Sequence, residues 1–222
     1  MSDFDLIKYL SRARRENGSA DCADIPSLQK IGKENRVSIA KLREQLSVAR
    51  SLGFVDVQPH HGITLRPYSF TPAVKQSLSY ALSVNPAYFQ DFSALRIQIE
   101  ANNWYQAVEK LTPADIEVLQ KLVDKANAKL SASPPQLPHA EHRALHMTIY
   151  SKLENVFVVG LLEAYWDAYE AVGLNQYTEL AYLKSVWQYH SQIVQALAQG
   201  DFDQGYRLLL AHMDLIKDRN AR

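Results

Sequence analysis

Alternation of apolar and polar residues, the pattern of a half-buried β-strand, marks two short neighbouring stretches of this 222-residue chain, residues 54–59 and 62–67. His60, His61 and Gly62 join the two stretches, so together they predict one β-hairpin. From Tyr68 onward no further alternating stretch occurs, and every segment has helical periodicity. A chain of this kind is expected to be mainly α, because it has too few strand-like stretches to form a large sheet.

Three helical segments precede the hairpin. The first spans residues 3–16, and the second begins near Ser27 and is about two turns long. After a short break, the third begins with Ser38 as its cap and stops at Gly53. The front of the chain is therefore expected to fold as helix, helix, turn, helix, hairpin.

The remaining residues predict an all-α antiparallel bundle of six or seven helices. Prolines, glycines and asparagines separate its helical segments, which are 73–84, 87–110, 113–131, 139–153, 155–172, 176–199 and 203–219. The change from hairpin to helix places the domain joint near residues 66–72. We therefore expect one domain at 1–67 and a second at 68–222.

Composition and missing motifs narrow the class of protein. Basic and acidic residues balance at 24 each, although residues 1–66 hold eleven basic residues against eight acidic ones. A single cysteine, Cys22, and the lack of a long apolar run predict a cytoplasmic protein with no membrane span. The glycine-rich phosphate-binding motifs are absent, as are GxSxG, HExxH and CxxC, which excludes most nucleotide-dependent enzymes.

Two helices joined by a tight turn, with a hairpin directly after the second, form a winged helix-turn-helix, in which the second helix enters the DNA major groove. Six basic and two acidic residues lie between Gln29 and Arg50. A merely solvated basic face is the alternative, but the hairpin that follows favours DNA binding. The candidate DNA-binding residues are Ser38, Lys41, Arg43, Gln45, Lys33, Arg36, His61 and Gly62.

Histidines are concentrated in the helical part of the chain. His142 and His146 are four residues apart, so on a helix their rings share one face, at a spacing that can bind a metal ion. His190 and His212 lie on two later helices separated by a turn, and an antiparallel pair could bring them to similar depth. The alternative is that these are ordinary core or surface histidines with their hydrogen bonds made, so the spacing alone does not decide whether they bind a metal.

Residues 25–67 resemble the DNA-binding half of the GntR family of bacterial transcription regulators. The similarity lies in the turn, the Val-Ser pair that starts the third helix, Arg43, the GFVDV strand and Gly62. Gln29 and Ile39 stand where the family usually has arginines that contact DNA. Affinity for double-stranded operator DNA is therefore expected to rest on Lys30, Lys33, Lys41, Arg43 and the hairpin, which forms the wing.

Nearly all of residues 70–220 resemble the FCD domain, the helical ligand-binding domain of the FadR-type branch of GntR regulators. The segments that carry the similarity are LRIQIE, EHRALHMTIYSKLEN, EAYWDAYE and QYHSQIVQALAQGDFDQGYRLLLAHM. In metal-binding members one helix supplies Asp-x-x-x-His and two later helices supply one His each. The resemblance implies a metal site at His142, His146, His190 and His212, with His142 in place of the usual aspartate. Four imidazoles favour a divalent transition metal, zinc or nickel first, over magnesium or calcium.

The resemblance also implies a small carboxylate effector beside the metal, faced by an arginine at the position of Arg96.

 
An intrahelical ion pair between Arg96 and Glu100, four residues on, is the alternative for this arginine. Four aromatic residues could line a pocket wall or simply fill the core: Tyr165, Trp166, Tyr169 and Tyr189.

The function expected from these features is that of a homodimeric transcription regulator whose binding to operator DNA responds to an organic acid. It would not be an enzyme and would have no catalytic residues. A metallohydrolase that activates water on a histidine-bound ion is the alternative. That alternative lacks an evident general base, because Glu141 would point away from His146 on the same helix.

Overall fold

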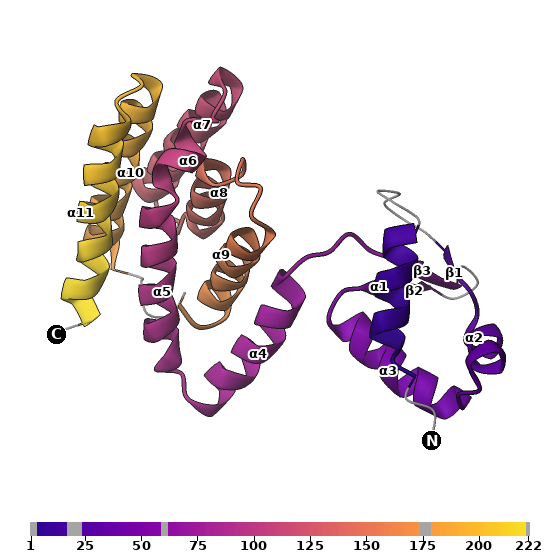
Figure 1. Cartoon of the computed structure of the whole chain (residues 1–222). Helices are drawn as coiled ribbons and strands as arrows, with labels where there is room; N and C mark the ends of the chain where they lie inside the picture. Colours follow the sequence, from indigo (N-terminus) through magenta and orange to yellow (C-terminus); the bar gives the residue numbers. More distant parts are fainter. Residues whose placement is uncertain (1–3, 17–23, 59–61, 174–178, 221–222) are drawn as a thin grey trace. The chain divides into compact units, whose positions relative to one another are not determined.

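The computed structural model of the chain describes residues 4–16, 24–58, 62–173 and 179–220. The chain forms two compact units, Met1–Gln76 and Ser77–Arg222. The division falls inside helix α4, some residues beyond the change of sequence pattern at Tyr68. Figure 1 shows the order of the elements along the chain.

Three helices build the N-terminal unit, and each begins close to its expected position. They are α1 (Leu6–Glu16), α2 (Leu28–Asn35) and α3 (Ile39–Ser51). The side chain of Ser27 caps α2 by accepting a hydrogen bond from the Lys30 amide, and Ser38 caps α3 in the same way through Lys41. Both predicted caps are therefore confirmed, and they fix the short turn between the two helices.

A three-stranded antiparallel sheet completes this unit. Its strands are β1 (Asp24–Ile25), β2 (Val55–Gln58) and β3 (Gly62–Leu65), in the order β1-β3-β2. The register pairs Val55 with Leu65 and Val57 with Ile63, which confirms the predicted hairpin. Strand β1 was not expected, because two residues are too few to show an alternating pattern. One core, built from helices and strands together, includes the buried residues Leu6, Leu10, Ile31, Leu42, Val55 and Leu65.

The second unit is helical throughout its described part, as the sequence predicts. Its elements are α4 (Thr71–Val84, which begins in the first unit), α5 (Tyr88–Asn102), α6 (Trp104–Val108), α7 (Pro113–Ser131), α8 (His139–Ile149), α9 (Val156–Ala168), a π-helical turn (Tyr169–Gly173), α10 (Leu180–Ala198) and α11 (Phe202–Asn220).

Three of these helical segments differ from the expectation, and one of them, 139–153, ends early at Ile149. The predicted helix 87–110 is broken at Asn103, which divides it into α5 and α6. The predicted helix 155–172 changes to a π-helical turn from Tyr169 onward. A π-turn inside or at the end of an α-helix often occurs near a functional site, because it changes the direction of the side chains that follow.

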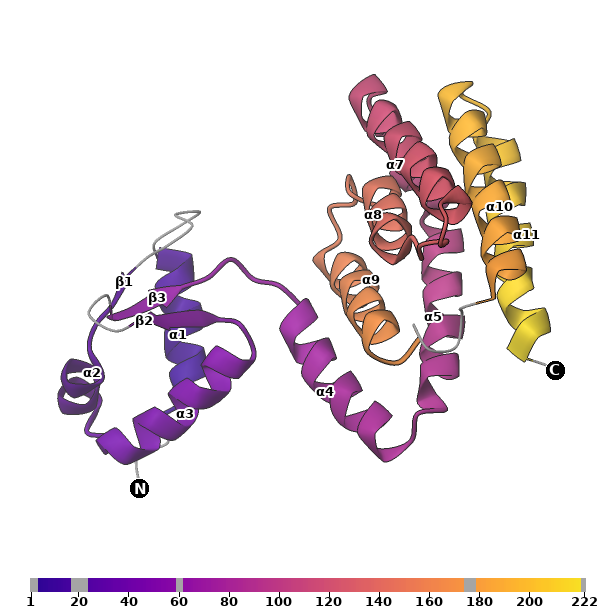
Figure 2. The same cartoon turned by 180° about the vertical axis from the view of Figure 1, so that it is seen from behind.

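Packing within the bundle follows the chain order only in part. Helix α10 packs against both α7 and α11, while α5 packs against α9 (Figure 2). The core between them is mainly aliphatic and also contains Trp104 and Trp187, which are almost completely buried. Within the described residues, no helix is both long and apolar enough to cross a membrane.

Candidate DNA-binding surface and metal centre

Basic side chains line the helix-turn-helix of the N-terminal unit. Lys33, Arg36 and Arg43 are exposed, and Lys41 is half-buried. Arg36 adopts a left-handed backbone with φ 55° at the end of α2, which turns the chain towards Ser38 and α3. The predicted contact residues of this stretch therefore lie on two helices joined by a short, capped turn.

Gln45 is placed differently from the other candidates on α3. Its Oε1 accepts a hydrogen bond from the Leu6 amide at 2.9 Å, and its Nε2 donates to the Phe4 carbonyl oxygen at 3.1 Å. Both ends of the amide thus hold the start of α1 against α3. The structure gives Gln45 a role inside the unit that its spacing on the helix did not reveal.

The wing supplies the last two candidates. His61 lies outside the described residues. Gly62 is exposed at the start of β3 and has φ 81°, in the region that favours glycine over residues with a side chain. The contribution of Gly62 is therefore to the shape of the wing.

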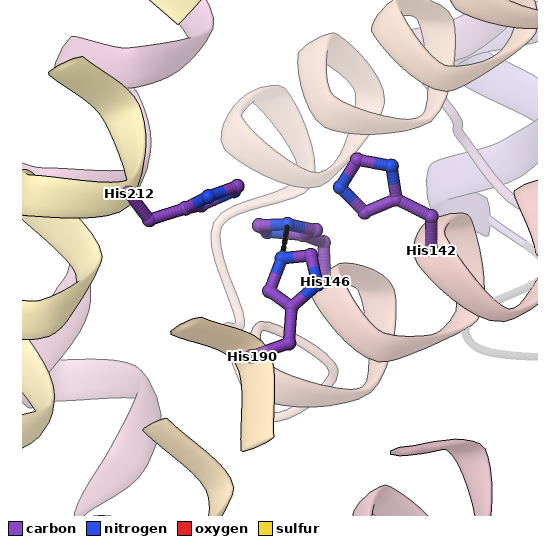
Figure 3. Close-up of side chains that lie close together, drawn as sticks. All are labelled: His142, His146, His190 and His212. Atoms are coloured by element: carbon purple, nitrogen blue, oxygen red, sulfur yellow. Dashed lines mark hydrogen bonds between the residues drawn. The ribbon is translucent and has the colours of Figure 1, made fainter. Parts of the chain in front are cut away.

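The four histidines singled out in the sequence meet at one place in the helical unit (Figure 3). His142 and His146 come from α8, His190 from α10 and His212 from α11. One ring nitrogen from each lies within 4.8 Å of the others. All four residues are buried, and His142 is the most exposed at 9%.

Helix geometry explains how these rings converge. The spacing of four on α8 places the rings of His142 and His146 with centroids 5.1 Å apart. Helices α10 and α11 pack side by side, and the ring centroids of His190 and His212 are 4.5 Å apart. The tight turn between these two helices therefore brings together residues that are far apart in sequence.

Burial sets the charge state of the four imidazoles. It lowers the pKa of His142, His146 and His190 well below the usual value and that of His212 to about 3. The nearby Arg96 guanidinium lowers the pKa of each of them further. At neutral pH the rings are uncharged, which is the form that binds a metal ion.

Several ring nitrogens of the cluster have no hydrogen-bond partner. They are His142 Nε2, His190 Nδ1 and both nitrogens of His212. A buried polar group without a partner costs about 1–3 kcal/mol. A cation bound among the rings would remove that cost, and a set of neutral imidazoles matches the preference of zinc and similar ions. The residues present therefore fit a divalent transition metal.

Arg96 makes the intrahelical ion pair that its sequence position left open, and it also lies against the histidine cluster. Its Nε donates to Glu100 Oε1 at 2.7 Å, which is the intrahelical ion pair. Its Nη2 lies 2.8 Å from His146 Nδ1, so the guanidinium also reaches the histidine cluster. The guanidinium carbon lies 5.1 Å from the ring centroids of both Tyr165 and Trp166. This buried cation is therefore held by a carboxylate and two aromatic rings.

Aromatic side chains surround the cluster. The rings of Trp166 and Tyr169 lie 4.8 and 5.8 Å from that of His142, and the half-buried Tyr189 lies 6.3 Å from His212. The ring of Trp187, which the sequence analysis did not single out, lies 4.9 Å from that of His190. The one signal for it was its position three residues before that histidine on α10.

Two acidic residues near the cluster differ in whether they contact its histidines. Glu141 is buried but pairs with Lys129 at 2.8 Å and with Lys125 at 3.3 Å, in line with the expectation that it points away from His146. Glu100, considered in the sequence only as a partner of Arg96, has Oε2 3.2 Å from His146 Nδ1. Sequence spacing could not reveal this contact, because the two residues are on different helices.

A winged helix-turn-helix is a DNA-binding fold, and here it precedes a helical bundle that holds a buried cluster of four histidines. The family model of the FCD domain matches residues 91–215, more than half of the chain. The chain belongs to the FCD family, and it is a transcription regulator of the GntR type with an FCD effector-binding domain.

Individual relatives agree with this assignment. The HTH-type transcriptional regulator LutR of Bacillus subtilis is 23% identical over 209 residues, which cover 91% of this chain and 94% of LutR. The structure of Streptococcus agalactiae GntR matches with a TM-score of 0.70 at 16% identity, over 97% of each chain. E. coli McbR/YncC matches with a TM-score of 0.52 at 20% identity, over 88% of this chain and 86% of that one. These two likenesses support the mainly α fold.

Proposed function

We propose that this regulator binds a two-fold-related operator as a homodimer and releases or engages it in response to a small organic acid. Residues 1–67 would contact DNA, and residues 68–222 would dimerise and bind the effector. The observation that carries the proposal is the buried set of four histidines beside Arg96, which fits a metal ion and an anion together.

The metal would be held by His146, His190 and His212, with His142 as the fourth ligand. Zinc or nickel suits this donor set best. When bound, the ion supplies a Lewis-acidic centre that can accept a carboxylate oxygen of the effector. The protein itself supplies buried aromatic rings around that centre.

Three groups of the protein could hold the rest of the effector. Arg96 presents Nη2 towards the cluster, while its Nε is used by Glu100. Trp166 Nε1 and Ser93 Oγ are buried and have no hydrogen-bond partner. Ser93 lies one turn before Arg96 on α5, and Trp166 contacts the guanidinium. An anionic, oxygen-rich ligand would satisfy all three groups.

Regulation would follow from a shift in populations. The effector would favour one arrangement of the two DNA-binding domains of the dimer, and DNA would favour another. A gel-shift titration of the regulator on its own promoter fragment, with and without metal and candidate acids, tests this directly. Binding to DNA that no acid changes, in either metal state, would contradict the effector proposal.

The Arg43→Ala substitution is expected to weaken operator binding by about 1–3 kcal/mol, because an exposed guanidinium on α3 is placed to contact a phosphate or a guanine. The measurement is a fluorescence-anisotropy titration at several salt concentrations, with circular dichroism as a check of folding. Lys121→Ala is the matched control, since it removes an exposed positive charge from α7 in the helical unit. If Arg43→Ala binds the operator as tightly as wild type, the assignment of α3 as the recognition helix is wrong.

An organic acid that binds at the metal is expected to raise the Tm of metal-loaded protein, because ligand binding stabilises the folded state by mass action. A thermal-shift screen of organic acids on metal-loaded and chelator-treated samples is the measurement. Equal shifts in both samples would show that the metal is not part of the ligand site. A full response in Arg96→Ala would show that this arginine serves only its ion pair with Glu100.

A further inference from the structure

We propose that Glu100 is a positioning residue for His146: its carboxylate accepts the Nδ1 proton of that imidazole and so directs Nε2 to the metal ion. The proposal rests on the metal site proposed above. Glu100 Oε2 and His146 Nδ1 are 3.2 Å apart, and both side chains are at most 1% exposed. Water therefore does not compete for this contact.

The other ring nitrogen of His146 already faces the cluster. His146 Nε2 lies 3.2 Å from His190 Nε2, which is itself one of the converging rings (Figure 3). A neutral imidazole carries one proton, and the nitrogen without it is the one that can bind a metal ion. A carboxylate at Nδ1 keeps the proton there, so the tautomer that it favours leaves the lone pair of Nε2 pointing at the site.

Arg96 does not compete with Glu100 for the Nδ1 position. Its Nη2 lies 2.8 Å from Nδ1 and 3.1 Å from Nε2 of the same ring. Because the ring carbon Cε1 lies between these two nitrogens, an atom this close to both is placed against the face of the imidazole, away from the in-plane lone pairs. The guanidinium therefore adds positive charge near the ring without fixing its tautomer.

The carboxylate of Glu100 is itself held in place. Oε1 pairs with Arg96 Nε at 2.7 Å. Oε2 is buried without a hydrogen-bond partner, and it lies 3.2 Å from His146 Nδ1. The hydroxyl of Tyr150 donates to the Glu100 carbonyl oxygen at 3.0 Å, which anchors the same turn of α5. One oxygen thus serves the ion pair, and the other is available to the imidazole.

Among the described residues, His146 is the member of the cluster that has a carboxylate within ion-pair distance of its ring. His190 Nδ1 and both nitrogens of His212 are buried without a hydrogen-bond partner. Carboxylates that orient a metal-binding histidine typically account for a 10- to 100-fold change in metal affinity. His146 is therefore the ligand whose orientation is set before the metal binds.

The test compares Glu100→Gln with wild type in zinc binding, measured by competition with a chromophoric chelator. We expect roughly 10-fold weaker binding in the variant, because the amide keeps the shape of the side chain but loses its charge. The control is Glu141→Gln, which neutralises another buried carboxylate that pairs with lysines, and its zinc affinity should equal that of wild type. Glu100→Gln that binds zinc as tightly as wild type would overturn the proposal.

A second measurement needs no variant. Long-range proton–nitrogen NMR correlations of the imidazoles in zinc-loaded wild-type protein distinguish a protonated from a metal-bound ring nitrogen. We expect His146 to carry its proton on Nδ1 and to bind zinc through Nε2. Zinc on Nδ1 of His146 would overturn the role of Glu100 while leaving the metal site intact, whereas wild-type protein that binds no zinc would overturn the site itself.

Discussion

Removal of the metal ion is expected to lower the stability of this protein strongly. The four histidines are almost completely buried, and without an ion several of their nitrogens have no partner. A ligand present at about 1,000 times its Kd contributes roughly 4 kcal/mol of stability. For a domain of this size, that corresponds to a fall in Tm of roughly 8–16 °C.

The measurement combines elemental analysis with thermal unfolding before and after treatment with a chelator. We expect about one transition-metal ion per chain in wild type, and loss of both the metal and the chelator response in His190→Ala and His212→Ala. His139→Ala is the control, because His139 begins α8 but lies outside the histidine cluster. Unchanged metal content in the His190 and His212 variants would refute the site.

Trp104→Ala is expected to destabilise the helical unit by about 3–5 kcal/mol, the usual cost of removing a large buried aromatic side chain. Trp104 is completely buried on the short helix α6, and its Nε1 donates to the Phe202 carbonyl oxygen at 3.0 Å. A Cβ atom at Gly205 would lie 2.7 Å from its ring, so the indole rests directly on α11. The loss therefore combines a cavity with a broken hydrogen bond between helices.

The free energy of unfolding of Trp104→Ala is measured by urea unfolding, monitored by circular dichroism. Gly205→Val should also be destabilising, because the valine side chain on α11 would collide with the indole ring of Trp104. Val118→Ala serves as the control, since Val118 is exposed on α7 and should change the unfolding free energy by less than about 0.5 kcal/mol. An unchanged midpoint in Trp104→Ala would show that α6 does not anchor α11.

The histidine cluster shows how much of a site can be predicted from the spacing of residues in the sequence. The pair His142 and His146 follows from the helical repeat, and the structure confirms that they share one face. Their meeting with His190 and His212 was inferred from resemblance, because nothing local relates residues that are 44 or more positions apart. The contact of Glu100 with His146 joins two helices and was not expected at all.

Local patterns in the sequence determined most of the elements of this protein. Helical periodicity, the caps Ser27 and Ser38 and the hairpin alternation depend on neighbours within a few residues, so they could be read directly. The tertiary structure alone decided the pairing of β1 with β3, the use of Gln45 to hold α1, and the approach of Glu100 to His146. These contacts depend on how whole helices and strands pack, and packing is set by the combined burial of many side chains that no short stretch of sequence contains.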